Sequence, residues 1–270
     1  PQAEAQFFRR VVERTARLVA AWQAQGFAHG VMNTDNMSIL GDTFDYGPFG
    51  FLDAYEADFV PNHSDGTGRY AFAQQPSIAL WNCWCLARAL SSLIDKDALE
   101  AGLAAFEPTF IDAYSELMRA KFGLCEARDG DRELILGALA LLEAQAVDYP
   151  LFMRRLGEFE LLGNNAALRT LLREPAAFDA WGQDYAARLA GEARDSSARR
   201  VSMYGVNPKY VLRKHLAQQA IERAEQMQDF SEVETLRRIL RRPFDEQSEH
   251  EAYAAGAPAW SRELAISCSS

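Results

Sequence analysis

The chain has 270 residues, of which 49% are hydrophobic and 24% charged, a composition typical of globular proteins that excludes a disordered, collagen-like or disulfide-scaffold protein. Its 38 acidic and 28 basic residues give a formal net charge of −10, which argues against general affinity for nucleic acid or for an anionic membrane surface. No apolar run reaches the roughly 18 residues of a membrane span. The four cysteines and the lack of a secretory signal pattern lead us to expect a cytoplasmic protein.

The first predicted element is an amphipathic helix over residues 4–25, where apolar side chains recur at helical spacing and Gly26 supplies the stop. Residues 27–50 change to short apolar runs separated by polar turns. This pattern predicts two short strands joined by a tight turn at Gly41-Asp42. Residues 51–76 are irregular, so the predicted β structure is a small patch near the beginning of the chain.

From residue 77 onward the pattern is helical almost to the end, and each segment has one apolar and one polar face. The pair Asn207-Pro208 predicts one helix start, and Ser231 with Glu234 predicts a capping box at another. We interpret the arginines within 237–242 as a solvated helix end. The predicted helices cover residues 77–95, 97–123, 131–157, 164–173, 176–191, 208–228 and 231–242.

The cysteines offer one candidate reactive thiol. Cys83 and Cys85 form a C-x-C pair that lacks the C-x-x-C spacing of zinc and redox sites, so we expect both to be buried as small apolar groups. Cys268 lies near the carboxyl terminus, where chains are usually accessible, and it is the thiol to consider for reactivity.

The chemical motifs of the sequence lie in residues 29–50. His29 and Asn36 are seven residues apart, as in the kinase catalytic loop H-R-D-x-x-x-x-N, in which the Asn binds magnesium. Nine residues later, Asp45-Tyr46-Gly47 has the form of the metal-binding D-F-G. An amide oxygen and a carboxylate are hard ligands for Mg²⁺, which bridges phosphate oxygens. The spacing therefore predicts a phosphoryl- or nucleotidyl-transfer site with Asn36 and Asp45 as metal ligands.

One position departs from the kinase pattern. Val31 stands where kinases place the catalytic Asp, and valine cannot accept a proton. The nearest carboxylate in the loop is Asp35, directly before Asn36, so a general base would have to be Asp35. An Asp in this position also commonly caps a turn, and the residues alone leave both roles open.

A longer series of ordered motifs resembles the selenoprotein O (SelO, YdiU) family of kinase-like protein adenylyltransferases. The resemblance starts with residues 27–53, which include the candidate catalytic loop. It extends along the whole chain, through the segments Asn62-His63-Ser64-Asp65, Gly68-Arg69-Tyr70, Gln75-Pro76, Trp81-Asn82, Met118-Arg119-Ala120-Lys121, Val147-Asp148-Tyr149, Asn207-Pro208-Lys209-Tyr210-Val211-Leu212-Arg213 and Ile266-Ser267-Cys268-Ser269-Ser270.

This resemblance implies a kinase-like fold that holds ATP in a flipped orientation, so that AMP rather than phosphate passes to Ser, Thr or Tyr hydroxyls of proteins. It implies Asp35 as the proton acceptor, Asn36 and Asp45 as ligands of Mg²⁺ or Mn²⁺, and Asp45 also as a contact of the ATP phosphates. The lack of Asp at position 31 is a trait of the family. We expect a mainly α chain, with a kinase-like C-lobe and its small β patch at 1–125 and an all-helical region at 126–270.

The resemblance also implies that part of the machinery lies elsewhere. The family's nucleotide-binding Lys, its Glu partner and a glycine-rich loop belong to an amino-terminal half, so we expect this chain to be a C-terminal portion lacking the ATP-binding N-lobe. Some members have a cysteine able to pair with the tail cysteine at the position of Pro61, which leaves redox control by Cys268 open. Two rival functions stay open: an ordinary γ-phosphoryl-transferring kinase, which Val31 disfavours, and a non-catalytic kinase-like binding module.

Overall fold

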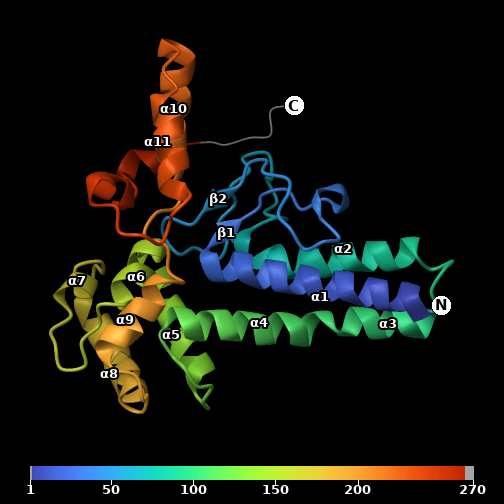
Figure 1. Cartoon of the computed structure of the whole chain (residues 1–270), viewed down its shortest axis with the longest axis horizontal. Helices are drawn as coiled ribbons and strands as arrows, with labels where there is room; N and C mark the ends of the chain where they lie inside the picture. Colours follow the sequence, from blue (N-terminus) through green and yellow to red (C-terminus); the bar gives the residue numbers. More distant parts are fainter. Residues whose placement is uncertain (1, 265–270) are drawn as a thin grey trace. The chain divides into compact units, whose positions relative to one another are not determined.

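The computed structural model describes residues 2–264, which are mainly helical and contain a two-stranded sheet (Figure 1). This confirms the predicted mainly α class with a small β patch. The chain divides into two compact units: unit 1 holds residues 2–50 and 57–117, and unit 2 holds residues 51–56 and 118–264. Among the described residues, none of the helices has both the length and the apolar character that crossing a bilayer requires.

Unit 1 is built around helix α1 (Gln2–Gln25), which confirms the first predicted helix and packs along α2 (Gln75–Ala89) and α3 (Lys96–Ala104) (Figure 1). Phe8, on the apolar face of α1, is fully buried. Helix α3 approaches it closely because position 102 is glycine: a Cβ atom on Gly102 would lie 2.7 Å from Cδ1 of Phe8. The missing side chain therefore sets the spacing between these two helices.

The helix predicted over 97–123 is in fact two helices, α3 and α4 (Phe106–Lys121), separated at Ala105. Pro108 explains the break. It has no N–H to donate to the carbonyl of Ala104, and its ring would clash with that carbonyl in a continuous helix.

The helix predicted over 131–157 is likewise divided, into α5 (Asp131–Gln145) and α6 (Tyr149–Leu156). Ala146 ends α5 in the left-handed conformation at φ 51°. Asp148 begins α6 as its N-cap, because its carboxylate accepts a hydrogen bond from the Leu151 N–H at 2.9 Å. Pro150 then occupies the first turn, where its missing N–H costs nothing.

The remaining α-helices and two 3-10 helices belong to unit 2. The segment predicted as 164–173 forms one helical turn, whereas the predicted helix 176–191 is confirmed. The polar sequence after Asp195 gave no apolar period, yet it forms a helix because the Asp195 carboxylate accepts from the Ala198 N–H at 2.8 Å. These elements are α7 (Ala166–Arg169), α8 (Pro175–Ala190), α9 (Ser196–Tyr204), α10 (Lys214–Met227), α11 (Ser231–Leu240) and the 3-10 helices η3 (Ser248–Ala254) and η4 (Ala259–Glu263).

The helix predicted to start at Pro208 is wrong at that end, since α10 begins only at Lys214. Asn207 does not cap it. Its buried side chain donates to the carbonyl of Lys121 at 2.9 Å instead. The backbone N–H groups of Lys209 and Tyr210 both donate to the carbonyl of Pro243, at 2.8 and 3.1 Å, which holds the segment out of a helix.

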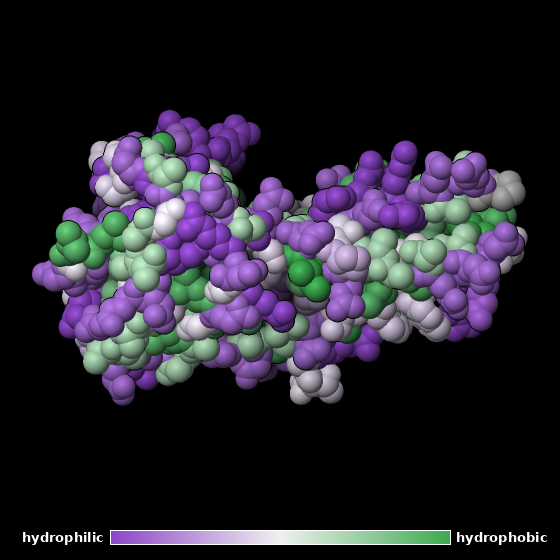
Figure 2. Space-filling view, turned by 90° about the horizontal axis from the view of Figure 1, so that it is seen from below, coloured by the Kyte–Doolittle hydropathy of each residue, from purple (hydrophilic) through white to green (hydrophobic). Residues whose placement is uncertain are grey.

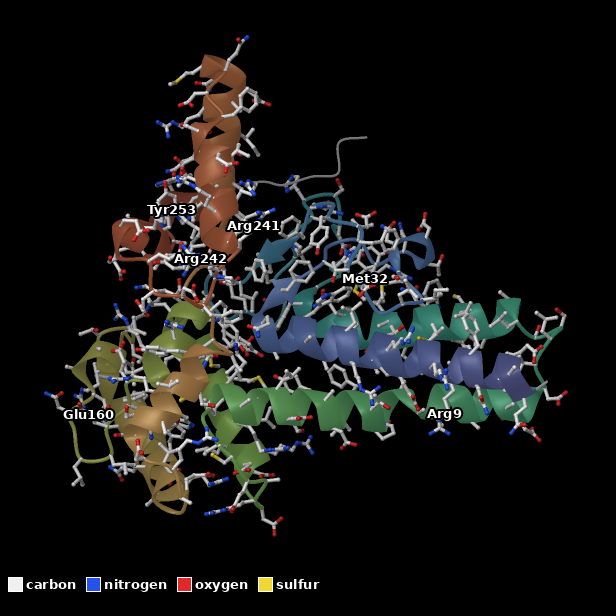
Figure 3. The ribbon with its side chains drawn as sticks, in the orientation of Figure 1. Arg9, Met32, Glu160, Arg241, Arg242 and Tyr253 are labelled. Atoms are coloured by element: carbon white, nitrogen blue, oxygen red, sulfur yellow. The ribbon has the colours of Figure 1, made fainter. Side chains whose placement is uncertain are left out.

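The predicted capping box of α11 is also wrong. Ser231 is the first helical residue, and its backbone N–H donates to the carboxylate of Asp229 at 3.0 Å. Glu234 pairs with Arg237 on the surface of the helix rather than with the backbone. The arginines beyond it, Arg241 and Arg242, lie exposed at the end of α11 as predicted (Figure 3).

Residues 51–56 belong to unit 2 by their contacts. The guanidinium of Arg213, only 3% exposed, donates to Asp53 at 2.7 Å and to Asp148 at 2.8 and 3.0 Å. The backbone adds two hydrogen bonds, from the Tyr149 N–H to the Asp53 carbonyl at 2.8 Å and from the Tyr55 N–H to the Val147 carbonyl at 3.0 Å. A buried cation shared by two carboxylates thus holds this short segment.

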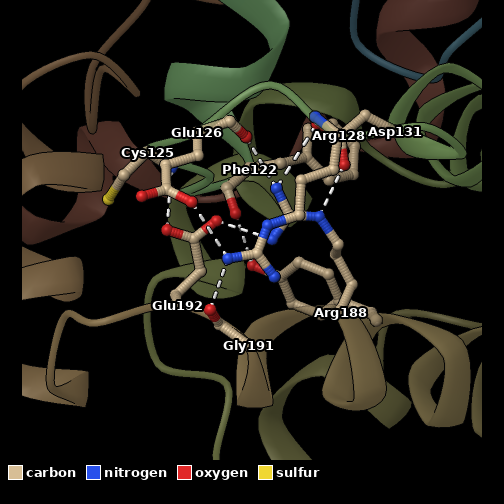
Figure 4. Close-up of polar contacts among 9 residues, drawn as sticks. Phe122, Cys125, Glu126, Arg128, Asp131, Arg188, Gly191 and Glu192 are labelled. Atoms are coloured by element: carbon tan, nitrogen blue, oxygen red, sulfur yellow. Dashed lines mark hydrogen bonds and ion pairs between the residues drawn. The ribbon is translucent and has the colours of Figure 1, made fainter.

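A second arginine network in unit 2 joins α8 to the start of α5 (Figure 4). Arg188 donates to Asp131 and to Glu192, both at 2.6 Å, and to the Glu126 carbonyl at 2.7 Å. Burial would raise the pKa of Glu192, but hydrogen bonds from Arg188 and from the Cys125 backbone lower it. The network therefore stays charged and fixes the loop before α5.

The thiols differ in their surroundings. Cys83 is buried, as predicted, and burial raises its pKa to about 11. Cys85 is only half-buried, and Cys125 is exposed. Cys268, the candidate reactive thiol, lies outside the described residues. A high pKa keeps Cys83 in the unreactive thiol form at neutral pH.

The face of the molecule seen in Figure 2 is a mosaic of hydrophilic and hydrophobic side chains. This is usual, because apolar atoms contribute more than half of the accessible surface of most folded proteins. Composition of the surface alone therefore marks no functional site on this face.

Candidate active site

The motif residues lie in the loop between strands β1 (Phe27–Ala28) and β2 (Gly50–Phe51), which pair in the two-stranded sheet. The hairpin predicted around Gly41-Asp42 is wrong, because no strand forms between 29 and 49. Leu40 is 61% exposed and has no facing strand to pack on. The turn instead rests on α1: a Cβ on Gly41 would lie 2.9 Å from the Cβ of Arg14.

His29 anchors the start of this loop. It is 1% exposed, and its backbone N–H donates to the Gln75 side-chain oxygen at 2.8 Å. The Gln75 amide donates in turn to the carbonyl of Phe27 at 2.9 Å. Burial lowers the pKa of His29, while the charge of Asp45 opposes that change. The neutral imidazole fits the contact of its Nδ1 atom, which accepts the Val31 N–H at 3.4 Å.

Asp35 and Asn36 lie side by side on a short 3-10 helix, η1 (Thr34–Asn36). The Asn36 backbone N–H donates to the Asn33 carbonyl at 3.0 Å, and its side-chain nitrogen donates to the Val31 carbonyl at 3.1 Å. This second bond uses the amide nitrogen and leaves the amide oxygen as a potential metal ligand. Asp35 is exposed, so a substrate hydroxyl can reach its carboxylate.

Asp45 occupies a turn over a group of aromatic rings. One carboxylate oxygen accepts the Gly47 N–H at 2.9 Å, which leaves the other for a ligand. Tyr46 and Phe49 pack against each other and against Phe27, with ring centroids 5.5 to 6.4 Å apart. These contacts hold the backbone of the Asp45 turn in place.

The structure links the predicted residues through His29. Its imidazole is close enough to Asp45 for that charge to affect its pKa, and Val31 connects it by hydrogen bonds to Asn36. Within residues 2–264 no three His, Cys, Asp or Glu side chains group as a metal cluster. Asn36 and Asp45 nevertheless offer the oxygen ligands that Mg²⁺ prefers, and Mg²⁺ commonly completes its shell with phosphate and water.

Sequence reasoning assigned no role to three side chains that hold this loop. Gln75 fixes His29, as described. The buried Asn82 amide donates to the carbonyl of Met32 at 3.0 Å, and Met32 lies in the loop region beside α2 (Figure 3). The Tyr70 hydroxyl donates to the Asn33 side-chain oxygen at 2.6 Å. For Asn82 the sequence did offer a signal, a polar amide within an apolar helix segment, because a buried amide needs a hydrogen-bond partner.

Comparisons with known proteins identify the family of the chain that carries this loop. Residues 1–241 match the family described as protein adenylyltransferase SelO. Proteins named protein nucleotidyltransferase YdiU from Thioalkalivibrio sulfidiphilus, Myxococcus xanthus and Vibrio vulnificus are 56%, 53% and 52% identical over 266, 268 and 269 residues. The alignments cover 96%, 98% and 97% of this chain but 54%, 55% and 54% of those proteins, so the chain spans about half the length of the curated relatives it matches. Such a match shows that the chain belongs to the SelO family of protein adenylyltransferases.

Proposed function

We propose that the protein carrying this chain transfers AMP from ATP to Ser, Thr or Tyr hydroxyls of other proteins. One observation carries the proposal. In this member of the SelO family, η1 places the exposed carboxylate of Asp35 beside Asn36, whose amide oxygen is left for a cation. The kinase-like C-lobe at 1–125 and the helical region at 126–270 are part of the same proposal.

Asp35 acts as the general base. As the substrate hydroxyl oxygen bonds to the α-phosphorus, its proton passes to the Asp35 carboxylate and the bond from the α-phosphorus to pyrophosphate breaks. Asn36 and Asp45 would hold Mg²⁺ or Mn²⁺, which supplies neutralisation of the phosphate charge. His29 is buried and neutral, so its work is to hold the loop rather than to move a proton.

Two rival functions differ in what they transfer. An ordinary kinase moves the γ-phosphoryl group, and the half-buried Val31 in place of a carboxylate disfavours it. A binding module transfers nothing and uses the loop only as a scaffold. Labelling the two ends of the ATP triphosphate separately distinguishes all three.

The test incubates the natural protein that carries this chain with protein substrate and Mg²⁺ or Mn²⁺, using α-³²P-ATP and γ-³²P-ATP in parallel. We expect label from the α position only. Asp35→Asn, which preserves shape, should slow transfer by roughly 10²–10⁴-fold if the carboxylate is the base. Label from the γ position alone would establish the kinase, and no label from either would establish the binding module.

A further inference from the structure

Arg69 is an exposed cation that stacks on two aromatic rings. Its guanidinium carbon is 5.0 Å from the ring centroid of Trp81 and 5.6 Å from that of Tyr70. No carboxylate among residues 2–264 forms an ion pair with it, although the whole chain carries a net charge of −10. Stacking orients the guanidinium while leaving its edge N–H groups for a carboxylate or phosphate.

The turn that presents Arg69 is locked by Asp65. One oxygen of that carboxylate accepts the Arg69 N–H at 3.0 Å and the Thr67 hydroxyl at 3.2 Å, and the other accepts the Tyr70 N–H at 2.8 Å. Burial alone would raise the pKa of Asp65, but these hydrogen bonds lower it. The turn therefore keeps its charged cap throughout the neutral pH range.

The same turn is bonded to the loop of the candidate base. The Tyr70 hydroxyl donates to the side-chain oxygen of Asn33 at 2.6 Å, and the Asn33 carbonyl receives the backbone N–H of Asn36. Asp35 lies between these two asparagines on η1. Arg69, Tyr70 and Asp35 thus belong to one hydrogen-bonded part of unit 1.

Trp81 also lines an adjoining groove of about 590 Å³, which we call the Trp81 groove. Leu80, Trp81 and Trp84 remain 37%, 44% and 46% exposed there, so the groove is mainly apolar. Glu107 is its one charged residue among those described. Its full lining is Ser77, Leu80, Trp81, Trp84, Leu103, Ala104 and Glu107.

We propose that Arg69 and the Trp81 groove bind the protein substrate, with Arg69 pairing with an Asp or Glu side chain near the acceptor hydroxyl and the groove taking a neighbouring apolar side chain. The inference rests on the proposed function for the identity of its occupant. A phosphate of ATP would also pair with Arg69, but it would gain nothing from the apolar groove. Glu107 repels a second acidic side chain, so the acidic residue of the substrate belongs at Arg69.

The test measures binding of fluorescein-labelled peptides to the 270-residue chain by anisotropy. One peptide carries Ser flanked by Asp and Leu, and its partner has Asn in place of Asp. We expect the acidic peptide to bind roughly tenfold more tightly at low salt, an amount typical of a bidentate charge-assisted pair. Arg69→Gln should remove the preference, and Arg69→Lys should retain part of it.

Arg88→Gln is the matched control, because the Arg88 guanidinium carbon lies 5.1 Å from the ring centroid of Trp84 in the same way but lies outside the Asp65 turn, which Tyr70 bonds to Asn33. It should keep the preference. Equal binding of the two peptides, binding of neither, or equal loss in both Gln variants would overturn the inference. Displacement of the acidic peptide by ATP alone would assign Arg69 to phosphate instead. Failure of AMP transfer in the labelling assay leaves this binding result standing, so the two proposals fail separately.

Discussion

Asp45 and Asp42 lie on the same loop but differ in their surroundings. Asp45 is half-buried in a turn backed by aromatic rings, and its charge opposes the lowering of the His29 pKa by burial. Asp42 is exposed on the Gly41 turn. Asp45→Asn keeps an oxygen for the Gly47 N–H but removes the charge that a cation needs. We expect it to abolish Mg²⁺-dependent ATP binding by the natural protein, measured by calorimetry, while Asp42→Asn leaves binding within about twofold. Equal effects would show that Asp45 is not the ligand.

Lys121 illustrates a buried charge with a consequence for stability. It is 2% exposed, its ammonium group lies 5.7 Å from the ring centroid of Tyr149, and burial lowers its pKa to about 7 from 10.5. Between these values the unfolded chain binds a proton that the folded chain does not. The free energy of unfolding therefore rises with pH across this window, by up to about 1.4 kcal/mol per unit.

Lys121→Met fills a similar volume without titrating. We expect it to be more stable than the parent at pH 7.5 and to lack the rise between pH 7.5 and 9.5 in urea denaturation. Lys96→Met is the control, because Lys96 is 84% exposed and should leave the slope unchanged. A Lys121→Met variant with the slope of the parent would refute this account.

Helix packing gives a prediction whose sign depends on the neighbours of a glycine. Replacing glycine by alanine inside a helix normally stabilises a protein by about 0.5–1 kcal/mol. At Gly137 of α5 the new Cβ would lie 3.6 Å from Trp181, an ordinary contact, and that gain is expected. At Gly102 of α3 it would lie 2.7 Å from the ring of Phe8, so Gly102→Ala should destabilise by about 1–3 kcal/mol.

Thermal and urea denaturation of the two alanine variants measure this contrast directly. The matched substitution removes the effect of helix propensity, which is the same at both positions. Stabilisation by both variants would mean that α1 and α3 can separate slightly at no cost.

Sequence periodicity found the long helices but not their boundaries. Helix α1 was predictable because its apolar stripe is continuous and a glycine follows it. The breaks at Pro108 and Pro150 were visible in the sequence, yet the apolar period continues through both and conceals them. The start of α10 was not predictable, because Asn207 bonds to the carbonyl of Lys121, 86 residues earlier in the chain.

The candidate site shows the same division. Spacing alone was enough to propose His29, Asn36 and Asp45 as candidates, since Mg²⁺ prefers amide and carboxylate oxygens as ligands. The supports at Tyr70 and Asn82 were not assigned, because each acts through a single hydrogen bond to a loop 37 or 50 residues away. Local patterns carry no record of such pairings.

At the scale of the whole molecule, the chain spans about half the length of its curated relatives. Asn36 and Asp45 are the two candidate protein ligands for a cation within these residues. Mg²⁺ with so few ligands depends on phosphates that are themselves held in place. We expect the 270-residue chain alone to bind Mg²⁺-ATP more weakly than millimolar affinity by calorimetry. Micromolar binding would locate a complete ATP site within these residues.

The Arg213 pair with Asp53 also has a consequence for synthesis on the ribosome. The two residues are 160 positions apart, and translation adds roughly 5–20 residues per second. Asp53 lies eight residues after the candidate metal ligand Asp45. Its partner Arg213 is therefore synthesised about 10–30 s later than Asp53 itself. The ion pairs of Arg213 with Asp53 and Asp148 cannot form during that interval, so the segment that follows the candidate site gains these contacts only late in synthesis.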